Sequence, residues 1–312
     1  MKKITQKIRL IISIGMGLFL GAASNAQLPS YQPVSGFSGT LNSVGSDTFN
    51  SMMGLWIEKF QAIYPNVTIQ HVGKGSSTAP PALTKGASQL GPVTRQMKAE
   101  ELGNFETKYG YKPTRVKVAL DALAVFVHKN NPIKGLSSQQ VDSIFSSTYK
   151  KGGSPINRWG RVGLGGSWKK KVISIYGRNN ISGTHGYFRK VALGGGKFSP
   201  RVQEDTDFDS LIMDISSTLS SIGYSGIGYL KAGIKALKID GKEPSFENCL
   251  TGDYPLARFL NIYINKKPSK KLDKLTFEFL RFALLKEGQE VVETYGYFPT
   301  EPELAEKVLL EL

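Results

Sequence analysis

The stretch IYGRNNISGTHGYFR, residues Ile175 to Arg189, combines the features of a strand, a turn and a helix start. The apolar run Val172 to Tyr176 predicts a short strand that turns at Gly177, and apolar residues later in the stretch recur at helical spacing. Ser182 precedes that run, as a helix N-cap does. The first N–H groups of a helix have no partner and carry partial positive charge. With the guanidinium of Arg178, they predict a seat for a small anion.

Two upstream segments repeat this order of strand, hydroxyl-rich turn and helix. Gly45 to Phe49 follows the apolar run Leu41 to Val44, and Gly73 to Thr78 follows the alternating run Val67 to Val72. One such turn is usually only a helix cap. Three of them, each directly after a strand, predict that the turns converge on one anion. The alternation of strands and helices to about residue 100 also favours parallel βα units.

The N-terminus has the pattern of an export signal. Residues 1–26 begin with a basic region, continue with an apolar run and end in Ser24-Asn25-Ala26, which predicts cleavage after Ala26. The apolar run is shorter than the ~20 residues that a membrane span needs. Residues 27–39, rich in Pro, Ser and Gly, are interpreted as a linker or frayed end. We therefore expect an exported, periplasmic chain.

Charge and cysteine content restrict the function further. The formal net charge is +15, which favours anionic partners. Nucleic acid is not expected as a partner of an exported protein. Cys249 is the single cysteine, so no intramolecular disulfide can form.

Residues 150–171 form a separate basic segment with seven cationic residues, no acid and two tryptophans, Trp159 and Trp168. The favoured interpretation is a solvated loop whose tryptophans pack inward, because its charges lack helical spacing. A contact with a membrane permease or with nucleic acid stays open as an alternative.

Catalytic and metal chemistry are not supported by the motifs. The nucleophile elbow G-x-S-x-G is absent, and the Gly-Lys-Ser/Thr ending of a phosphate-binding P-loop is missing after Gly73. His185 lies near Ser182 and Thr184, but adjacent helical positions point apart, so a Ser–His pair is not favoured. The histidines and Cys249 lack metal-ligand spacing. No catalytic residue, metal or cofactor is predicted.

Four motifs, in order, give the chain a resemblance to a known family. They are Gly45-Ser46-Asp47-Thr48, Gly75-Ser76-Ser77-Thr78, the run Leu90 to Lys98, and Arg178 to Thr184. They resemble the PstS family, the periplasmic phosphate-binding proteins of phosphate ABC importers, from about Gly39 to near the C-terminus. The resemblance implies phosphate as ligand, a membrane permease as partner and no enzymatic activity.

The resemblance also implies the site residues. Thr48 and Phe49 correspond to a hydroxyl and a backbone N–H on phosphate, and Ser76 to a second hydroxyl. The full expected set is Ser46, Thr48, Phe49, Ser76, Thr94, Arg95, Arg178, Ser182, Gly183 and Thr184.

One position departs from the best-known branch of the family, which has an aspartate where this chain has Thr94. A carboxylate accepts the proton of hydrogen phosphate and rejects sulfate, whereas a threonine hydroxyl can donate or accept. Asp47 is a candidate replacement, or it only caps its helix. Arg95 adds positive charge, or it pairs with a nearby acid.

The predicted fold is α/β, with the two lobes of a type II periplasmic binding protein and a ligand cleft between them. Lobe one is expected to comprise residues 40–118 and 259–312, and lobe two residues 119–258. A secreted phosphatase, a surface-interaction protein and a binding protein for arsenate, sulfate or molybdate are the alternatives.

Overall fold

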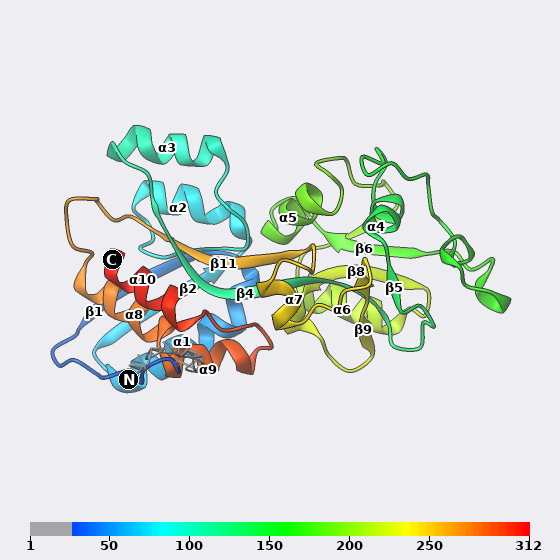
Figure 1. Cartoon of the computed structure of the whole chain (residues 1–312). Helices are drawn as coiled ribbons and strands as arrows, with labels where there is room; N and C mark the ends of the chain where they lie inside the picture. The colour runs from blue at the N-terminus through cyan, green and yellow to red at the C-terminus, as the bar shows by residue number, and fades with distance from the viewer. Residues whose placement is uncertain (1–26) are drawn as a thin grey trace, which may run out of the picture.

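The structure, a computed structural model, describes residues 27–312 and shows two lobes side by side (Figure 1). The expected signal peptide, residues 1–26, lies outside the described residues. The strands are β1 (Gly39–Gly45), β2 (Val67–Gly73), β3 (Gly91–Val93), β4 (Thr114–His128), β5 (Gly135–Leu136), β6 (Ser174–Arg178), β7 (Val202–Asp205), β8 (Ser221–Gly226), β9 (Ile234–Ala236), β10 (Lys238–Ile239) and β11 (Ala257–Ile264). The helices are α1 (Asn50–Ile63), α2 (Ala79–Lys85), α3 (Ala99–Tyr109), α4 (Ser138–Phe145), α5 (Gly183–Val191), α6 (Phe208–Ser217), α7 (Phe246–Leu250), α8 (Lys274–Leu284), α9 (Lys286–Thr294) and α10 (Pro302–Glu311).

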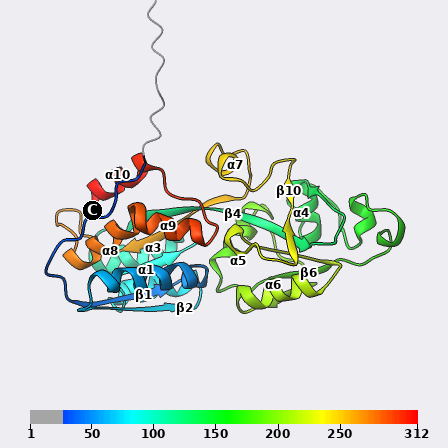
Figure 2. The same ribbon diagram turned by 90° about the horizontal axis from the view of Figure 1, so that it is seen from below.

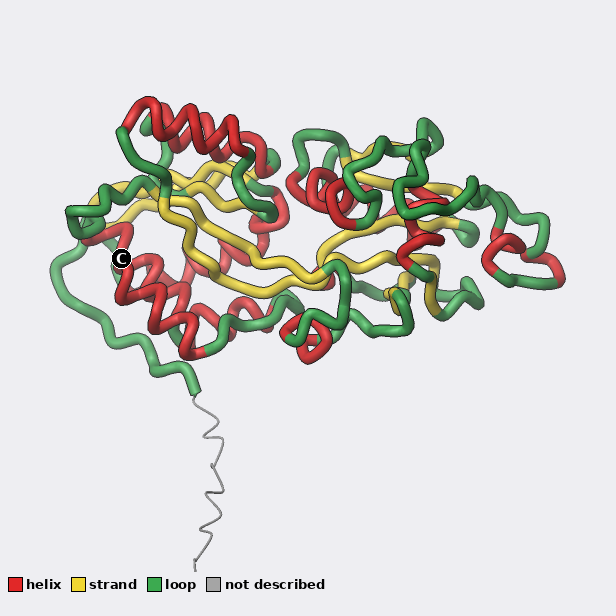
Figure 3. The backbone as a smooth tube through the Cα atoms, turned by 45° about the horizontal axis from the view of Figure 1, so that its top comes forward, coloured by secondary structure: helices red, strands yellow, loops and turns green. Residues whose placement is uncertain are grey.

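Strand β4 belongs to both lobes. Its first part pairs antiparallel with β11, and residues Leu123 to Val127 pair antiparallel with β8. The pairing with β11 shifts register between Leu260 and Asn261, at the crossing between the lobes. From Ala119 to Val127 the strand is buried, as expected where both faces of a sheet are covered. Figure 3 shows these strands running from one lobe into the other. The predicted two-lobed fold is confirmed.

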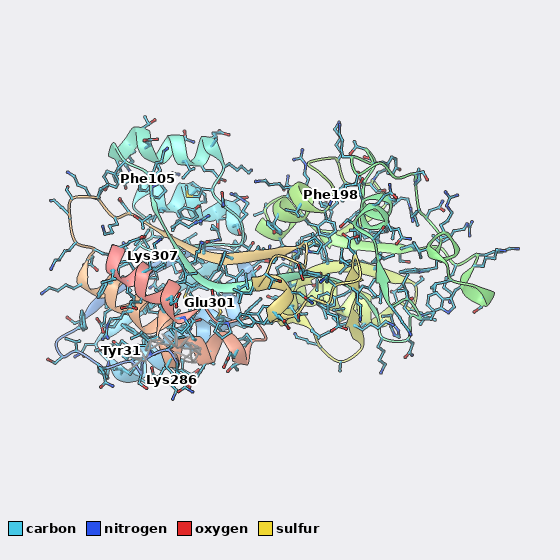
Figure 4. The ribbon with its side chains drawn as sticks, in the orientation of Figure 1. Tyr31, Phe105, Phe198, Lys286, Glu301 and Lys307 are labelled. Carbon is cyan, nitrogen blue, oxygen red and sulfur yellow. The ribbon has the colours of Figure 1, made fainter. Side chains whose placement is uncertain are left out.

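Lobe one packs helices on both faces of its strands. The parallel pair β1–β2 reaches β3 through a bridge from Ser43 to Leu90, and β3 continues to β11 and β4. Helices α1, α8 and α9 cover one face (Figure 2), and α2 and α3 cover the other, with Phe105 between them (Figure 4). The apolar face of α1 packs into the core of lobe one, where Met52, Trp56 and Phe60 are fully buried.

Lobe two is built on the sheet β4–β8–β6–β7, in which β6 is parallel to both of its neighbours. Its core stacks Phe188 on Tyr224, with ring centroids 3.9 Å apart. The basic segment packs Trp159 into this core, while Trp168 is half-buried against it. The tryptophans therefore pack inward, as the interpretation of residues 150–171 as a solvated loop expected.

The central stretch differs from its prediction at Gly177. Strand β6 does not turn there but continues to Arg178. A Cβ at Gly177 would lie 2.8 Å from a methyl carbon of Val202 and 3.2 Å from the Tyr224 ring. The glycine is therefore required by packing between strands, and the turn comes after Arg178.

The segment before β1 has no helix or strand, yet it is packed rather than frayed. Tyr31 is buried, and its hydroxyl lies 2.6 Å from both the Tyr64 hydroxyl and the Glu278 carboxylate. The N–H of Lys286 donates to the Pro29 carbonyl, and Figure 4 shows Tyr31 and Lys286 at the same side of lobe one. The Pro-rich composition did not predict these contacts, because Glu278 lies 247 residues from Tyr31 in the sequence.

None of the helices in residues 27–312 has the length and apolarity to cross a membrane.

Candidate anion-binding site between the lobes

One side of the site is formed by the turn after β1. Ser46 caps the 3₁₀ helix η1 (Asp47–Phe49): its hydroxyl accepts the Thr48 N–H at 3.2 Å, and its carbonyl accepts the Phe49 N–H. The Thr48 hydroxyl is buried and has no hydrogen-bond partner within residues 27–312. A buried hydroxyl without a partner is costly, so Thr48 is suited to bind a ligand.

Ser76 and Thr94 meet Gly183 across the lobe boundary. The Ser76 hydroxyl accepts the Thr94 N–H at 3.1 Å, and the two side-chain oxygens are 3.3 Å apart. A Cβ on Gly183 would lie only 2.1 Å from the Ser76 oxygen and 2.5 Å from the Thr94 oxygen. Glycine at the start of α5 thus lets the helix N-terminus approach the lobe-one hydroxyls.

Arg178 provides the positive charge and is fixed by its own lobe. Its Nε and Nη2 donate to the carbonyls of Asp205 and Thr206 at 3.2 and 2.7 Å, and its guanidinium lies over the Phe208 ring at 4.1 Å. The side chain is 2% exposed, and Nη1 has no partner in the described part of the chain. One donor of a rigidly held guanidinium is therefore available for an anion.

Asp47 extends from lobe one to this arginine. Its Oδ2 lies 2.6 Å from Nη2 of Arg178. Neither oxygen of the carboxylate has a hydrogen bond from residues 27–312, so the pair is a charge contact with unfavourable hydrogen-bond angles. Because Ser46 caps η1, Asp47 does not act as the side-chain cap.

Ser182 and Thr184 flank Gly183 at the start of α5. The Ser182 hydroxyl caps the helix, accepting the His185 N–H at 3.5 Å, which confirms the predicted N-cap. The Thr184 hydroxyl is fully buried and unpartnered among the residues described. It joins Thr48 and Arg178 Nη1 as a third unpaired donor, and these groups come from both lobes.

Arg95 is the exception in the predicted set. Its Nη1 and Nη2 each donate to the Glu101 carboxylate at 2.7 Å. Burial opposes ionisation of Glu101, but these bonds and the Lys98 N–H lower the pKa of its carboxyl. Arg95 thus does what the second interpretation expected: it pairs with an acid, at the rim of the site.

Sequence reasoning missed the groups that hold the site residues in place. Arg258 of β11 donates to Asp121 of β4 at 2.8 Å and to the Thr94 carbonyl at 3.3 Å, so a buried ion pair at the lobe crossing positions Thr94. The available signal was Asp121 inside the apolar run Val118 to Val127, and Arg258 at the start of the apolar run of β11.

A carboxyl group beside Arg178 is perturbed. Burial raises the pKa of Asp205 to about 6, the nearby Asp214 and Asp207 act in the same direction, and Arg178 opposes them. One Asp205 oxygen is buried without a partner in the described residues.

The site has the parts for binding but not for nucleophilic catalysis. The His185 ring stacks on Phe198, with centroids 4.3 Å apart, and only its backbone N–H contacts Ser182. Burial, together with Arg189 and Arg178, lowers the pKa of His185 to about 4, which leaves the ring neutral near pH 7. Across residues 27–312, no group of three His, Cys, Asp or Glu residues is placed to hold a metal ion.

Comparison with known proteins gives the class. The model of the PBP superfamily domain matches residues 32–287, and the chain belongs to this superfamily. The crystal structure of an ABC-type phosphate transport receptor from Vibrio cholerae has the same fold, with a TM-score of 0.68 at 22% identity over 83% of this chain and all of that one.

Two further relatives narrow the family. The chain is 51% identical to the phosphate-binding protein PstS of Pseudomonas aeruginosa, over 93% of this chain and 92% of that protein. It therefore belongs to the PstS family. A substrate-binding protein assigned to a phosphate ABC transporter of Clostridium perfringens, solved with bound phosphate, has a TM-score of 0.72 at 26% identity over 84% of this chain and all of that one. These names describe substrate binding, a non-enzymatic role.

Proposed function

We propose that this chain binds inorganic phosphate between its lobes and delivers it to the permease of a phosphate ABC transporter. The observation that carries the proposal is a group of buried donors from both lobes that have no partner in residues 27–312: the hydroxyls of Thr48 and Thr184 and Nη1 of Arg178. Hydroxyls, a guanidinium and a helix N-terminus are the groups that bind oxyanions. The named ligands of the PstS relatives agree with this chemistry.

The charges around the proposed ligand nearly cancel. Arg178 is paired with Asp47, so the dianion would be held mainly by N–H and O–H dipoles. Such dipoles can bind an anion without full charge balance. The remaining predicted residues, Ser46, Phe49 and Ser182, would act through the turns that they form, and Ser76, Thr94 and Gly183 through their contact across the lobes.

Ligand binding would favour the closed arrangement of the lobes. The lobes already meet at the site, where the Ser77 N–H donates to the Ile181 carbonyl at 3.4 Å. An anion that bonds to both sides stabilises this form by its differential affinity. We propose the boundaries 40–118 with 259–312 for lobe one and 119–258 for lobe two. The separate cores on either side of the crossing strands support them.

Asp47 is proposed to provide selectivity. Hydrogen phosphate carries a proton near neutral pH and sulfate does not, so an acceptor without a proton distinguishes them. Asp47 is a buried carboxylate beside Arg178, whereas the Thr94 hydroxyl can serve either anion.

Export to the periplasm is proposed on residues 1–26, whose basic and apolar regions fit a cleavable signal peptide. Cell fractionation with and without these residues tests this point.

Calorimetry with phosphate, arsenate, sulfate and molybdate tests the ligand. We expect one phosphate per chain and weaker binding of sulfate. If sulfate or molybdate bound more tightly than phosphate, that anion would be the ligand in place of phosphate. Hydrolysis of a phosphomonoester would instead favour the phosphatase alternative, and we expect none.

A further inference from the structure

A second cleft opens between the lobes, next to the proposed phosphate site. It has a volume of about 750 Å³, and its lining residues come from the segment before α3, from α5 and from β11. Figure 1 shows where these elements lie. Lobe one contributes residues 94–99 with Arg115 and Lys117 of β4, and lobe two contributes residues of α5. Thr94 and His185 line this cleft and also adjoin the phosphate site, so the two spaces are neighbours.

The lining is strongly cationic, and none of the described residues in it is acidic, so we call this space the basic cleft. The cationic residues are Arg95, Lys98, Arg115, Lys117, Arg189, Lys190 and Arg258. Two of them are neutralised in place, Arg95 by Glu101 and Arg258 by Asp121. The other five form no ion pair with any residue of 27–312.

Lys117 shows how this positive charge is accommodated. Its ammonium lies 4.3 Å from the centre of the Phe259 ring, so an aromatic face rather than a carboxylate faces it. Burial, together with Arg115 and Lys307, lowers the pKa of Lys117; Lys307 is labelled on α10 in Figure 4. Repulsion among these groups is not compensated within the described protein.

Closure of the lobes increases this repulsion. Arg189 and Lys190 belong to lobe two, whereas Lys98, Arg115 and Lys117 belong to lobe one. Bringing like charges together in a concave, partly desolvated space is unfavourable, and a multiply charged anion would reverse the sign of the effect. The volume lies in the range of small-molecule pockets, about 300–1,000 Å³. A single phosphate would fill only a small part of this volume, whereas a chain of several phosphates could contact cations of both lobes.

We propose that the basic cleft binds a linear oligophosphate such as tripolyphosphate, and that this ligand and phosphate each strengthen binding of the other. The first part stands on the cleft alone, while the second rests on the proposed phosphate site. Because the oligophosphate contacts both lobes, it favours the closed form that phosphate also favours. Coupling of this kind is reciprocal.

The direct test is calorimetry of tripolyphosphate with the full mature chain already saturated with orthophosphate, at about 20 mM salt, where screening is weak. We expect one site per chain. The double variant Lys117→Gln/Lys190→Gln should weaken tripolyphosphate binding at least about tenfold, since it removes one charge from each lobe. Lys98→Gln/Lys190→Gln changes only exposed side chains and gives the same test if the first variant is unstable.

The matched control is Lys169→Gln/Lys170→Gln in the basic segment, which removes the same charge far from the cleft. We expect it to weaken tripolyphosphate binding less than about twofold. An equal loss in the control and cleft variants would mean attraction to net charge alone and would overturn the proposal. So would absence of binding, or displacement of tripolyphosphate by orthophosphate.

A nucleoside triphosphate and a nucleoside monophosphate identify the source of the phosphoryl chain. Binding of the triphosphate no tighter than tripolyphosphate supports an inorganic chain, and tighter binding supports an organic one. Equal binding of the monophosphate would overturn recognition of a phosphate chain.

The proposed coupling is tested by measuring phosphate binding with and without tripolyphosphate. Tripolyphosphate should lower the Kd of phosphate at least about threefold, and an unchanged Kd would overturn the coupling. If phosphate fails to bind at all while tripolyphosphate binds, the proposed function fails and the basic cleft stands.

Discussion

The proposed phosphate site and the basic cleft are neighbours but use charge in opposite ways. The proposed site is buried and, within residues 27–312, contains one cation, Arg178, which is paired with Asp47, together with hydroxyls that have no hydrogen-bond partner. The cleft contains five cations without a carboxylate partner in residues 27–312. Fixed dipoles recognise the shape and protonation of a ligand, whereas an open set of like charges recognises total charge. Phosphate affinity at the proposed site should therefore change when single atoms are removed, whereas oligophosphate affinity in the cleft should depend on the salt concentration.

The largest expected effect follows from the space at Gly183. Gly183→Val should weaken phosphate binding by more than about 100-fold, because its side chain would overlap the Ser76 and Thr94 oxygens and hold the lobes apart. Calorimetry measures the loss. Gly186→Ala is a matched control on α5, since a Cβ there meets only the Arg95 side chain at 3.6 Å.

Ser182→Ala should cost much less, about 0.5–1.5 kcal/mol, because it removes one capping hydroxyl. A larger loss for Ser182→Ala than for Gly183→Val would mean that the close approach at Gly183 is not required.

Arg178→Ala should weaken phosphate binding by about 2–4 kcal/mol, because a buried charged contact is lost. The arginine also fixes the carbonyls of Asp205 and Thr206, so we expect a lower Tm as well. Arg178→Lys keeps the charge but not the planar fork, and should recover only part of the affinity. An unchanged Kd in Arg178→Ala would remove this residue from the site.

Asp47→Asn tests whether the Asp47 carboxylate distinguishes phosphate from sulfate. We expect weaker phosphate binding and competition by sulfate, because the replacement amide can donate to a bare oxyanion. Asp209→Asn is the control: that carboxylate is exposed, in a surface pair with Lys231. Competition titrations give the phosphate-to-sulfate ratio, and an unchanged ratio in Asp47→Asn would place selectivity elsewhere.

The smallest expected effect is a change in thermal stability caused by the ionisation of Asp205, which lies beside Arg178. The pKa of Asp205 is raised to about 6 in the folded protein, so folding binds protons, and stability from this group increases as pH falls through 6. In the phosphate-free protein, Asp205→Asn should therefore raise Tm at about pH 7.5, and the gain should shrink toward pH 4.

Asp207→Asn is the opposite control for Asp205→Asn. The Ser210 N–H bond lowers the pKa of Asp207, whose carboxylate caps α6, so its loss should lower Tm at neutral pH. A gain for Asp205→Asn that does not change with pH would show that its charge is not the cause.

The sequence predicted the local parts of the site well. The strand, the cap and the helix around Ser182 follow from short-range periodicity, and the ordered motifs identified the fold. The sequence did not predict which distant side chains contact one another. The Glu101 carboxylate accepts hydrogen bonds from both Nη groups of Arg95, and the Tyr31 hydroxyl donates to Glu278, 247 residues away in the sequence. No local pattern encodes which distant acid meets which base, because tertiary packing decides it.

The shared strand β4 has a consequence for how the protein melts. Residues on one strand pair with β11 in lobe one and with β8 in lobe two, so neither sheet can lose this strand without exposing the edge of the other. Separate cores would ordinarily give separate unfolding transitions. Because β4 is covalently and hydrogen-bonded continuous through both cores, we expect the two lobes to unfold in a single transition, as one thermodynamic domain.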